Sequence, residues 1–255
     1  MRDASFKDYF SDAAVGYATF RPRYPAELFD FVATLPARCR TVWDCATGNG
    51  QAAVPLAARF DRVIATDASA SQIALAEPHS LVSYHVALAD ASGIEASSVD
   101  LVTVAQALHW LPFDRFFKEV RRVLVPDGIL AVWCYTRPLI AGVLGEIVDR
   151  FYYGACGPHW FPERDLVDQG YRTIAMPFVD IPSPAFSIDA PLTLGEFAGY
   201  LRTWSAARRL AAVVGYDPVV AVEAELRGHW GGAEARQLVK WPIHLRAGHV
   251  RHPTR

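Results

Sequence analysis

Short apolar runs recur along the first half of the chain, and the segments between them carry apolar residues at helical spacing. The runs cover residues 41–43, 62–66, 82–88, 99–105 and 129–135. Apolar runs of this length are typical of strands buried on both faces of a parallel sheet. Strands that alternate with helices along the chain predict an α/β fold with helices on both sides of the sheet.

Helical spacing is clearest in residues 114–125. The apolar residues there recur three and four positions apart, so they share one face and are expected to be core. They are Phe116, Phe117, Val120, Val123 and Leu124. Further helices are expected at 51–60 and 69–76, and from Pro25 onward, because proline is favoured at the first helical position.

The second half of the chain has a weaker pattern. We expect helices at 139–155, 192–212 and 218–229. Thr193 and Glu196 form a capping-box pattern at the start of the second helix. Residues 172–186 have the pattern of a strand followed by an irregular connection. The run from Gln237 predicts an edge strand, since Pro242 lacks the N–H group that an inner strand needs.

The composition narrows the class of protein. The 255 residues are 52% hydrophobic and carry a net charge of −2, which favours a large folded core. The largest clusters of basic residues are the pairs 121–122 and 208–209, so a nucleic-acid partner is not expected. No apolar run is long enough to span a bilayer, and the start has no signal-peptide core. The four cysteines match no zinc spacing, so we expect reduced thiols, a cytoplasmic location and no metal.

The most informative local pattern is D-x-A-x-G-x-G at residues 44–50. A strand ends on Asp44, a loop of small residues follows, and a helix is expected from Gln51. A strand, glycine loop and helix in this order bind nucleotide-like ligands in many parallel sheets, because glycine lets the backbone approach the ligand closely. A helix start would add free N–H groups. The alternative is a tight turn that binds nothing.

Three successive predicted strands each end on or near a carboxylate. They deliver Asp44, Asp67 and Asp90 to the same edge of the sheet. Asp44 suits a positively charged amino group, Asp67 can accept two ribose hydroxyls, and Asp90 can accept from an adenine amine. S-Adenosylmethionine carries all three groups and has no phosphate. A dinucleotide site would instead show GxGxxG directly after the strand, so a nicotinamide-dependent oxidoreductase is the less favoured alternative.

On these residues the chain resembles the class I S-adenosylmethionine-dependent methyltransferases. "VWDCATGNG" looks like their first motif, with Ala46 in place of the usual first glycine, and "VIATDAS" and "ALADAS" look like their ribose and adenine motifs. "FKEVRRVLVPDGILAVW" is similar to the helix, turn and strand that these enzymes carry after the fourth strand. The resemblance covers residues 10–136. "YATFRPRYP" and "AQALHWL" look like the small-molecule subfamily that includes trans-aconitate methyltransferase.

The resemblance implies a fold and a division of the chain. The fold is an α/β Rossmann-like three-layer sandwich, with a seven-stranded, mostly parallel sheet and one antiparallel edge strand. Residues 1–255 would form a single methyltransferase domain. Residues 1–30 would cover the cofactor, with Tyr17 and Arg21 helping to hold its carboxylate. Residues 138–235 would form a helical and loop insertion that covers the substrate.

His109 and Trp110 follow the fourth strand, at the sheet edge where ligands bind in open α/β folds. His109 is the predicted catalytic residue, either orienting the substrate or acting as a base, and Trp110 could wall the adenine or methyl site. A packed loop is the alternative for both. Candidate wall and clamp residues in the second half are Trp160, Trp204, Arg137, Arg164 and Arg202.

The predicted cofactor-binding set combines the three strand ends, the glycine loop, the N-terminal segment and the end of the fourth strand. It comprises Tyr17, Arg21, Asp44, Ala46, Thr47, Gly48, Gly50, Gln51, Asp67, Ala68, Asp90, Ala91, Ala105, Gln106 and Trp110.

The expected reaction is methyl transfer from S-adenosylmethionine to a small molecule, by O-methylation of a carboxylate or a hydroxyl. A carboxylate acceptor needs no base, so alignment supplies most of the catalysis, whereas a hydroxyl would need one. The expected partner is a small-molecule acceptor, with no nucleic acid and no membrane, for a monomer or homodimer. A non-catalytic protein that binds S-adenosylmethionine is the other alternative.

Overall fold

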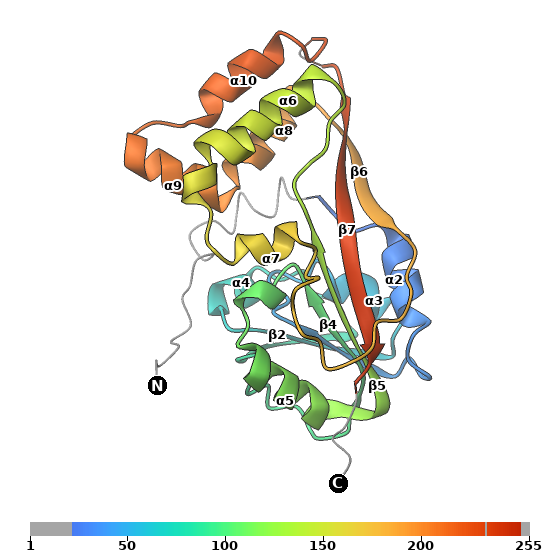
Figure 1. Ribbon diagram of the computed structural model, residues 1–255. Coiled ribbons are helices and arrows are strands. Elements are labelled where there is room, and N and C mark those ends of the chain that lie inside the picture. Colours follow the sequence, from blue (N-terminus) through green and yellow to red (C-terminus); the bar gives the residue numbers. More distant parts are fainter. Residues whose placement is uncertain (1–21, 233, 251–255) are drawn as a thin grey trace.

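A seven-stranded sheet runs through the computed structural model, which describes residues 22–232 and 234–250 (Figure 1). In spatial order the strands are β3 (Val82–Val86), β2 (Arg62–Asp67), β1 (Thr41–Cys45), β4 (Val99–Ala105), β5 (Leu124–Tyr135), β7 (Gln237–His249) and β6 (Phe186–Leu192). The first five are parallel, and β7 is antiparallel to both of its neighbours. The predicted fold class is confirmed.

The strand at the C-terminal end of the chain is not itself at the sheet edge, which corrects the expectation drawn from Pro242. Residues 243–249 of β7 pair with β5, whereas residues 237–243 pair with β6 on the other side. Pro242 lies where β7 passes from one partner to the other, and its carbonyl accepts from the backbone N–H of Thr136 at 3.2 Å. A proline is tolerated there because few ladder bonds depend on its missing N–H.

Alternate side chains of the strands enter different cores, as the twofold repeat of a strand requires. Val42 and Leu101 face a core that contains α2 (Ala26–Ala33) and α3 (Ala53–Ala57). Trp43 and Val102 face a second core that contains α5 (Phe113–Val123). The apolar residues predicted for that helix face are all buried, and Ser69 is the N-cap of α4 (Ala70–Ala74). These two cores give the three-layer arrangement.

The helix after the glycine loop is shorter than expected. Residues 48–52 form turns, and α3 begins at Ala53 rather than at Gln51. Five residues make little more than one turn, so the loop offers individual N–H groups rather than a strong helix dipole.

The second half of the chain forms a helical part above the sheet, supported by β6 and one half of β7 (Figure 1). Its helices are α6 (Val143–Asp149), η3 (Arg150–Ala155), η4 (Gly157–His159), α8 (Leu194–Arg202), α9 (Ser205–Val214) and α10 (Val219–Arg227). A further helix, α7 (Arg164–Asp168), lies between this part and the sheet. The capping box of Thr193 and Glu196 is present.

Three expectations for this half were wrong. The helix predicted at 192–212 breaks into α8 and α9, because Trp204 is extended and its ring is buried against Phe151 at 5.8 Å. Residues 172–185 form no strand, because three of them are prolines, which lack the backbone N–H group that strand pairing needs. Helix α7 was missed because its five residues are too few to show a helical pattern, and strand β6 was missed although its apolar residues alternate along the chain.

Candidate functional site

The glycine loop leaves β1 through several residues with positive φ. Ala46, Gly48 and Gly50 have φ of 55°, 58° and 90°. A methyl group built on Gly50 would lie 2.3 Å from the hydroxyl of Tyr84, so only glycine fits there. Thr47 donates its backbone N–H to the Thr66 carbonyl of β2 at 2.9 Å, which ties the loop to the sheet edge. Ala46 adopts its backbone angles at a steric cost that glycine would avoid.

Asp44 lies beneath this loop and is fully buried. Its two carboxylate oxygens accept hydrogen bonds from the hydroxyls of Thr47 at 2.6 Å and Thr103 at 2.8 Å. Burial raises the pKa of Asp44 to about 6, against the lowering effect of the two threonines. A buried carboxylate with a raised pKa gains stability from a nearby cation.

Asp67 stabilises the glycine loop through hydrogen bonds to backbone N–H groups. Its carboxylate accepts from the backbone N–H of Gly48 at 2.9 Å and of Ser69 at 2.8 Å. Each carboxylate oxygen can accept more than one hydrogen bond. Asp67 is the last residue of β2 and Asp44 lies near the end of the neighbouring strand β1, and the two carboxylates are close enough to repel each other.

The third predicted acid has a different environment. Asp90 is half-buried after β3 and pairs with Arg115 of α5 at 3.0 Å. Ala91 bridges back to Leu88, so the segment forms a tight loop. Gln51 and Ala68 are partly buried in the loops after β1 and β2, and Ala105 is partly buried at the end of β4. Tyr17 and Arg21 lie outside the described residues.

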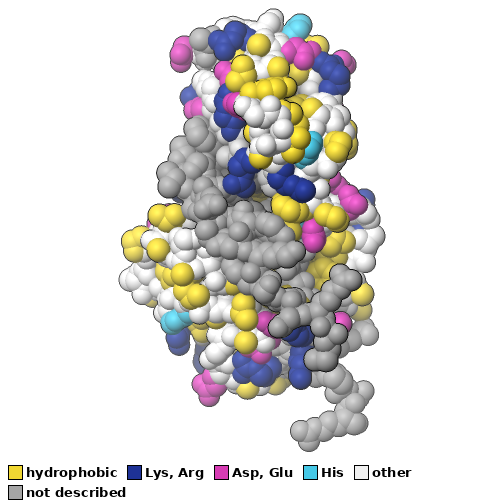
Figure 2. All heavy atoms as spheres, turned by 90° about the vertical axis from the view of Figure 1, so that its left-hand side faces the viewer, with side chains coloured by type: hydrophobic (Ala, Val, Ile, Leu, Met, Phe, Trp, Pro, Cys, Tyr) yellow, Lys and Arg dark blue, Asp and Glu magenta, His cyan; other side chains and the backbone are white. Residues whose placement is uncertain are grey.

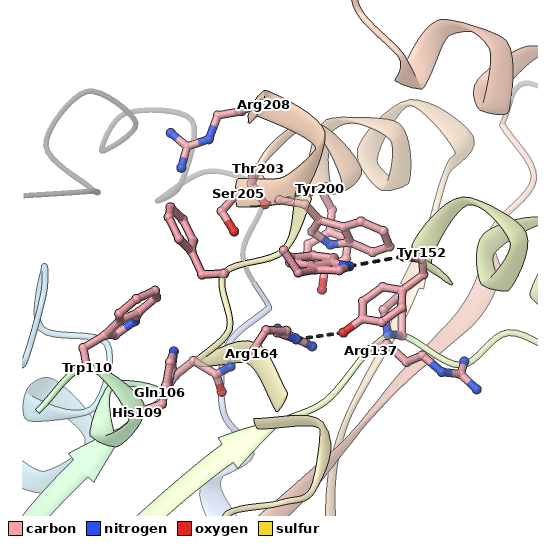
Figure 3. Close-up of a pocket in the computed structure, with 14 residues that line it drawn as sticks. Gln106, His109, Trp110, Arg137, Tyr152, Arg164, Tyr200, Thr203, Ser205 and Arg208 are labelled. Carbon is pink, nitrogen blue, oxygen red and sulfur yellow. Dashed lines mark hydrogen bonds between the residues drawn. The ribbon is translucent and has the colours of Figure 1, made fainter. Parts of the chain in front are cut away.

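A cavity opens immediately beyond β4 (Figure 3). Strand β4 is parallel to β1, with Thr103 opposite Asp44, so the glycine loop and the residues that follow β4 leave the same edge of the sheet. The lining is mostly aromatic and basic. It consists of Gln106, His109, Trp110, Arg137, Pro138, Tyr152, Trp160, Phe161, Arg164, Tyr200, Thr203, Trp204, Ser205 and Arg208. Figure 2 shows Lys and Arg side chains at mid-height, between the helical part and the sheet.

The residues after β4 are held in unusual backbone geometry. Gln106 has φ of 56°, and its amide bonds both backbone groups of Tyr135, accepting at 2.6 Å and donating at 3.2 Å. Gln106 therefore joins the ends of β4 and β5 while it lines the cavity. Trp110 meets Phe161 edge to face, with ring centroids 5.6 Å apart.

His109 is buried in the cavity wall. Its Nδ1 lies 2.8 Å from the hydroxyl of Tyr171. Burial, with a smaller effect of Arg164, lowers the pKa of His109 to about 3, so the imidazole is neutral at ordinary pH.

Comparison with known proteins identifies the family. Residues 43–132 match the family described as "Methyltransferase domain". A methyltransferase of Dictyostelium discoideum is 33% identical over 204 residues, which is 78% of each chain. The solved structure of a protein described as a type II methyltransferase from Anaeromyxobacter dehalogenans is 39% identical, with a TM-score of 0.86 over 91% of this chain and 98% of that one. The chain belongs to the class I S-adenosylmethionine-dependent methyltransferases.

A more distant relative is described as dependent on S-adenosylmethionine. An S-adenosylmethionine-dependent methyltransferase of Saccharomyces cerevisiae is 30% identical over 131 residues, 48% of this chain and 45% of that one. S-Adenosylmethionine is the cofactor of this methyltransferase. In the described part of the chain no helix has the length and apolarity to cross a bilayer. Those same residues include no group of three histidine, cysteine or acidic side chains placed to hold a metal ion.

Some of the candidate wall and clamp residues of the methyltransferase line the cavity, and one does not. Arg164 and Arg137 line the cavity, and Trp160 and Trp204 form part of its wall. Arg202 was a wrong candidate, because it is not among the lining residues and pairs with Asp217 at 2.6 Å and Glu223 at 2.9 Å. Several lining residues were missed from the sequence, since no spacing relates them. They are Tyr152, Phe161, Tyr200, Thr203, Ser205 and Arg208.

Proposed function

We propose that this methyltransferase methylates an oxygen atom of a small molecule, either a carboxylate or a hydroxyl. The observation that supports the proposal is the arginine-rich, aromatic cavity that begins directly beyond β4, at the sheet edge from which the glycine loop also leaves. Small planar acids match such a wall, because aromatic rings bind flat apolar bodies and arginine binds carboxylates. "YATFRPRYP" and "AQALHWL" resemble the trans-aconitate type of enzyme, which is consistent with a small acid.

In this proposal the three acids hold the cofactor by its separate parts. Asp44 would face the amino group, Asp67 the ribose, and Asp90 with Ala91 the adenine. The backbone of Ala46, Thr47, Gly48, Gly50 and Gln51 would form the cradle, with Ala68, Ala105, Gln106 and Trp110 around it. Tyr17 and Arg21 remain proposed carboxylate partners within a covering segment 1–30.

When bound, S-adenosylmethionine supplies an activated methyl group on a positively charged sulfur. The chain then has to align the acceptor oxygen with that methyl group and to exclude water. No general acid is needed, because the leaving group is a neutral thioether. The proposed cover is the segment 138–235 of a single domain, and Trp160 and Trp204 are its proposed wall.

The test is a product assay. The protein is incubated with S-adenosylmethionine and a panel of aromatic and unsaturated carboxylic acids and phenols, and S-adenosylhomocysteine and methylated products are measured by mass spectrometry. Formation of a methyl ester or methyl ether supports the proposal. Tight cofactor binding with no turnover across the panel would instead support a non-catalytic binding protein, and binding of NAD in place of S-adenosylmethionine would contradict the cofactor site.

We also propose that the enzyme works in the cytoplasm on a free small molecule, as a monomer or homodimer, without a nucleic-acid or membrane partner. The net charge of −2 and the absence of long basic runs support this part of the proposal.

A further inference from the structure

Tyr171 is held in place behind His109. It follows α7, is fully buried, and has φ of 59°, an unfavourable value for a tyrosine. The preceding Gly170 also has positive φ, and a side chain there would lie 2.6 Å from the ring of His244. Residues with strained backbones persist where the surrounding structure fixes them. The Tyr171 hydroxyl is thereby presented to Nδ1 of His109 at 2.8 Å.

The hydrogen bonds of Tyr171 determine which nitrogen of His109 carries the proton. Burial raises the pKa of the Tyr171 hydroxyl, and the backbone N–H groups of His109 and Leu108 act in the opposite direction, so they face its oxygen, which can only accept from them. The phenol has one proton of its own, and within the described residues Nδ1 of His109 is its single acceptor. A buried O–H group without an acceptor is costly, so the phenol donates to Nδ1. The neutral imidazole therefore has its proton on Nε2.

A histidine in this form is a hydrogen-bond donor toward the cavity and a poor base. Nδ1 is occupied by the phenol, and Nε2 already has its proton. Nε2 makes no hydrogen bond to any residue that the structure describes, and His109 lines the cavity. The ring therefore offers an N–H group to a molecule bound there.

Arg164 offers further donors to the same cavity. Its Nε atom is bonded to the Tyr152 hydroxyl at 2.7 Å and to Asp168 at 3.0 Å. The guanidinium stacks on the ring of Trp160 at 5.0 Å, which fixes its plane. Its two terminal amino groups make no hydrogen bond within residues 22–232 and 234–250, and the side chain is only 18% exposed. Figure 3 shows Arg164 between Gln106 and His109 on one side and Tyr152 on the other.

We propose that Arg164 and the Nε2–H group of His109 together bind a carboxylate of the methyl acceptor, and that Tyr171 is the positioning residue that keeps His109 a donor. This inference rests on the proposed function and narrows it. The described lining has three arginines and no acidic residue, and although Arg137 pairs with Asp149 and Arg164 with Asp168, the charged donors that face the cavity suit an anion. With His109 unable to take a proton, a hydroxyl acceptor has no base there, whereas a carboxylate needs none. The acceptor is then a carboxylic acid, methylated as its anion.

The first test measures the tautomer directly and needs no variant and no turnover. The wild-type protein is labelled with ¹⁵N-histidine, saturated with S-adenosylhomocysteine, and studied by NMR at pH 7. We expect the His109 resonances of a neutral ring protonated at Nε2. A ring protonated at Nδ1, or a charged ring, would overturn the assignment. In Tyr171→Phe, which lacks the donor, the fixed Nε2–H signature should be lost.

The second test measures binding of benzoate, with benzamide as its neutral counterpart, by calorimetry in the presence of S-adenosylhomocysteine. Arg164→Gln should weaken benzoate binding by about tenfold to a hundredfold and leave benzamide little changed. Arg202→Gln is the matched control, because Arg202 is also paired with an aspartate but lies outside the cavity. Failure of the wild-type protein to bind benzoate, or equal losses in both variants, would overturn the carboxylate pair.

The third test separates a donor from a base. His109→Gln retains an N–H donor near the position of Nε2 but has no basic nitrogen, whereas His109→Leu retains neither. If His109 is a donor, Gln should restore benzoate binding to within about threefold of wild type and Leu should lose about tenfold or more. Equal losses in both variants would contradict the proposal. Binding of S-adenosylhomocysteine, measured alongside, reports whether the proposed methyltransferase site itself is intact, so failure of the carboxylate pair is distinguishable from failure of the site.

Discussion

The two sides of the candidate site are built in opposite ways. The cofactor side comes from successive strand ends within residues 44–91, and each of its three carboxylates is held by a partner in the glycine loop, in a neighbouring strand or in α5. The acceptor side draws on residues from 106 to 208 that no local spacing relates. The first side is acidic and glycine-rich, and the second is basic and aromatic. In the function proposed above, a cationic cofactor and an anionic acceptor would each meet a surface of complementary charge.

The difference also concerns how much each side depends on backbone geometry. On the cofactor side, positive φ at Ala46, Gly48 and Gly50 shapes the cradle. On the acceptor side, the backbone mainly serves to aim side chains, as at Gln106 and Tyr171. Small changes to the main chain should damage the first side most, whereas changes of side-chain charge should damage the second.

Gly50→Ala should have the largest effect on stability. An alanine there would have to adopt the φ of 90° that Gly50 has, and its methyl group would lie 2.3 Å from the Tyr84 hydroxyl. We expect a loss of about 2–4 kcal/mol in the free energy of unfolding. Gly93→Ala is the control, since Gly93 has φ of 73° but nothing within 4 Å, and it should lose about 1 kcal/mol. Urea denaturation of both variants gives the comparison, and equal losses would show that the cradle is not tightly packed.

Asp67→Ala should weaken cofactor binding by about 2–3 kcal/mol, roughly 30-fold to 150-fold in affinity, because it removes the proposed ribose acceptor and a support of the loop. Calorimetry with S-adenosylhomocysteine measures this. Asp61→Ala is the matched control, since Asp61 is exposed just before the opposite end of β2. Wild-type affinity in Asp67→Ala would remove this residue from the site.

Asp44→Asn tests whether the cofactor side is prepared for a cation. The folded chain raises the pKa of Asp44 from 3.8 to about 6, so it binds the proton more tightly than the unfolded chain does. The charged form therefore destabilises the free protein above about pH 6, and this effect disappears as the pH falls below 3.8. We expect the variant to be more stable than wild type at pH 8 by about 1–3 kcal/mol and to converge with it near pH 4.

The same variant should lose cofactor affinity at pH 8, because the amino group loses its charged partner. Denaturation and calorimetry at several pH values report the two effects separately. A variant that is less stable at every pH would show that the two threonine hydrogen bonds outweigh the cost of burying the charge.

Ala46→Gly should have the smallest effect. Ala46 has φ of 55°, which glycine adopts at no steric cost. We expect a gain of about 0.5–1 kcal/mol in the free energy of unfolding, measured by thermal denaturation. A loss of stability would mean that the alanine methyl group makes a packing contact worth more than the strain it imposes.

The same contrast explains what could be predicted from the sequence. The strands at 41–45, 62–67 and 99–105 were found because continuous apolar runs report burial on both faces, and the acids followed because each ends or follows a strand. The short α3 was overestimated, because turn residues 48–52 carry no pattern that separates them from a first helical turn. On this side the relevant contacts are local in sequence.

The residues of the acceptor side could be predicted from the sequence only in part. His109, Trp110 and Arg164 were found by their place in the chain or their chemistry, whereas Tyr171 carries no signal except that it follows a glycine. Its role depends on packing α7 against the loop after β4, two segments that are 62 residues apart at the hydrogen bond. Arg202 was chosen wrongly, because a charge alone does not tell whether a side chain faces a cavity or an ion pair on another helix.

Leu139 and Lys240 are hydrogen-bonded to each other in both directions, at 2.7 and 3.0 Å, where the chain leaves β5 and where it returns along β7. The hundred or so residues between them thus start and finish at one point on the sheet. A segment of different length and shape can be inserted at that junction without any change in the order of the five parallel strands. Chimeras that exchange this segment between relatives should keep the cofactor and change the acceptor, which offers a simple route by which one ancestral scaffold acquires many substrates.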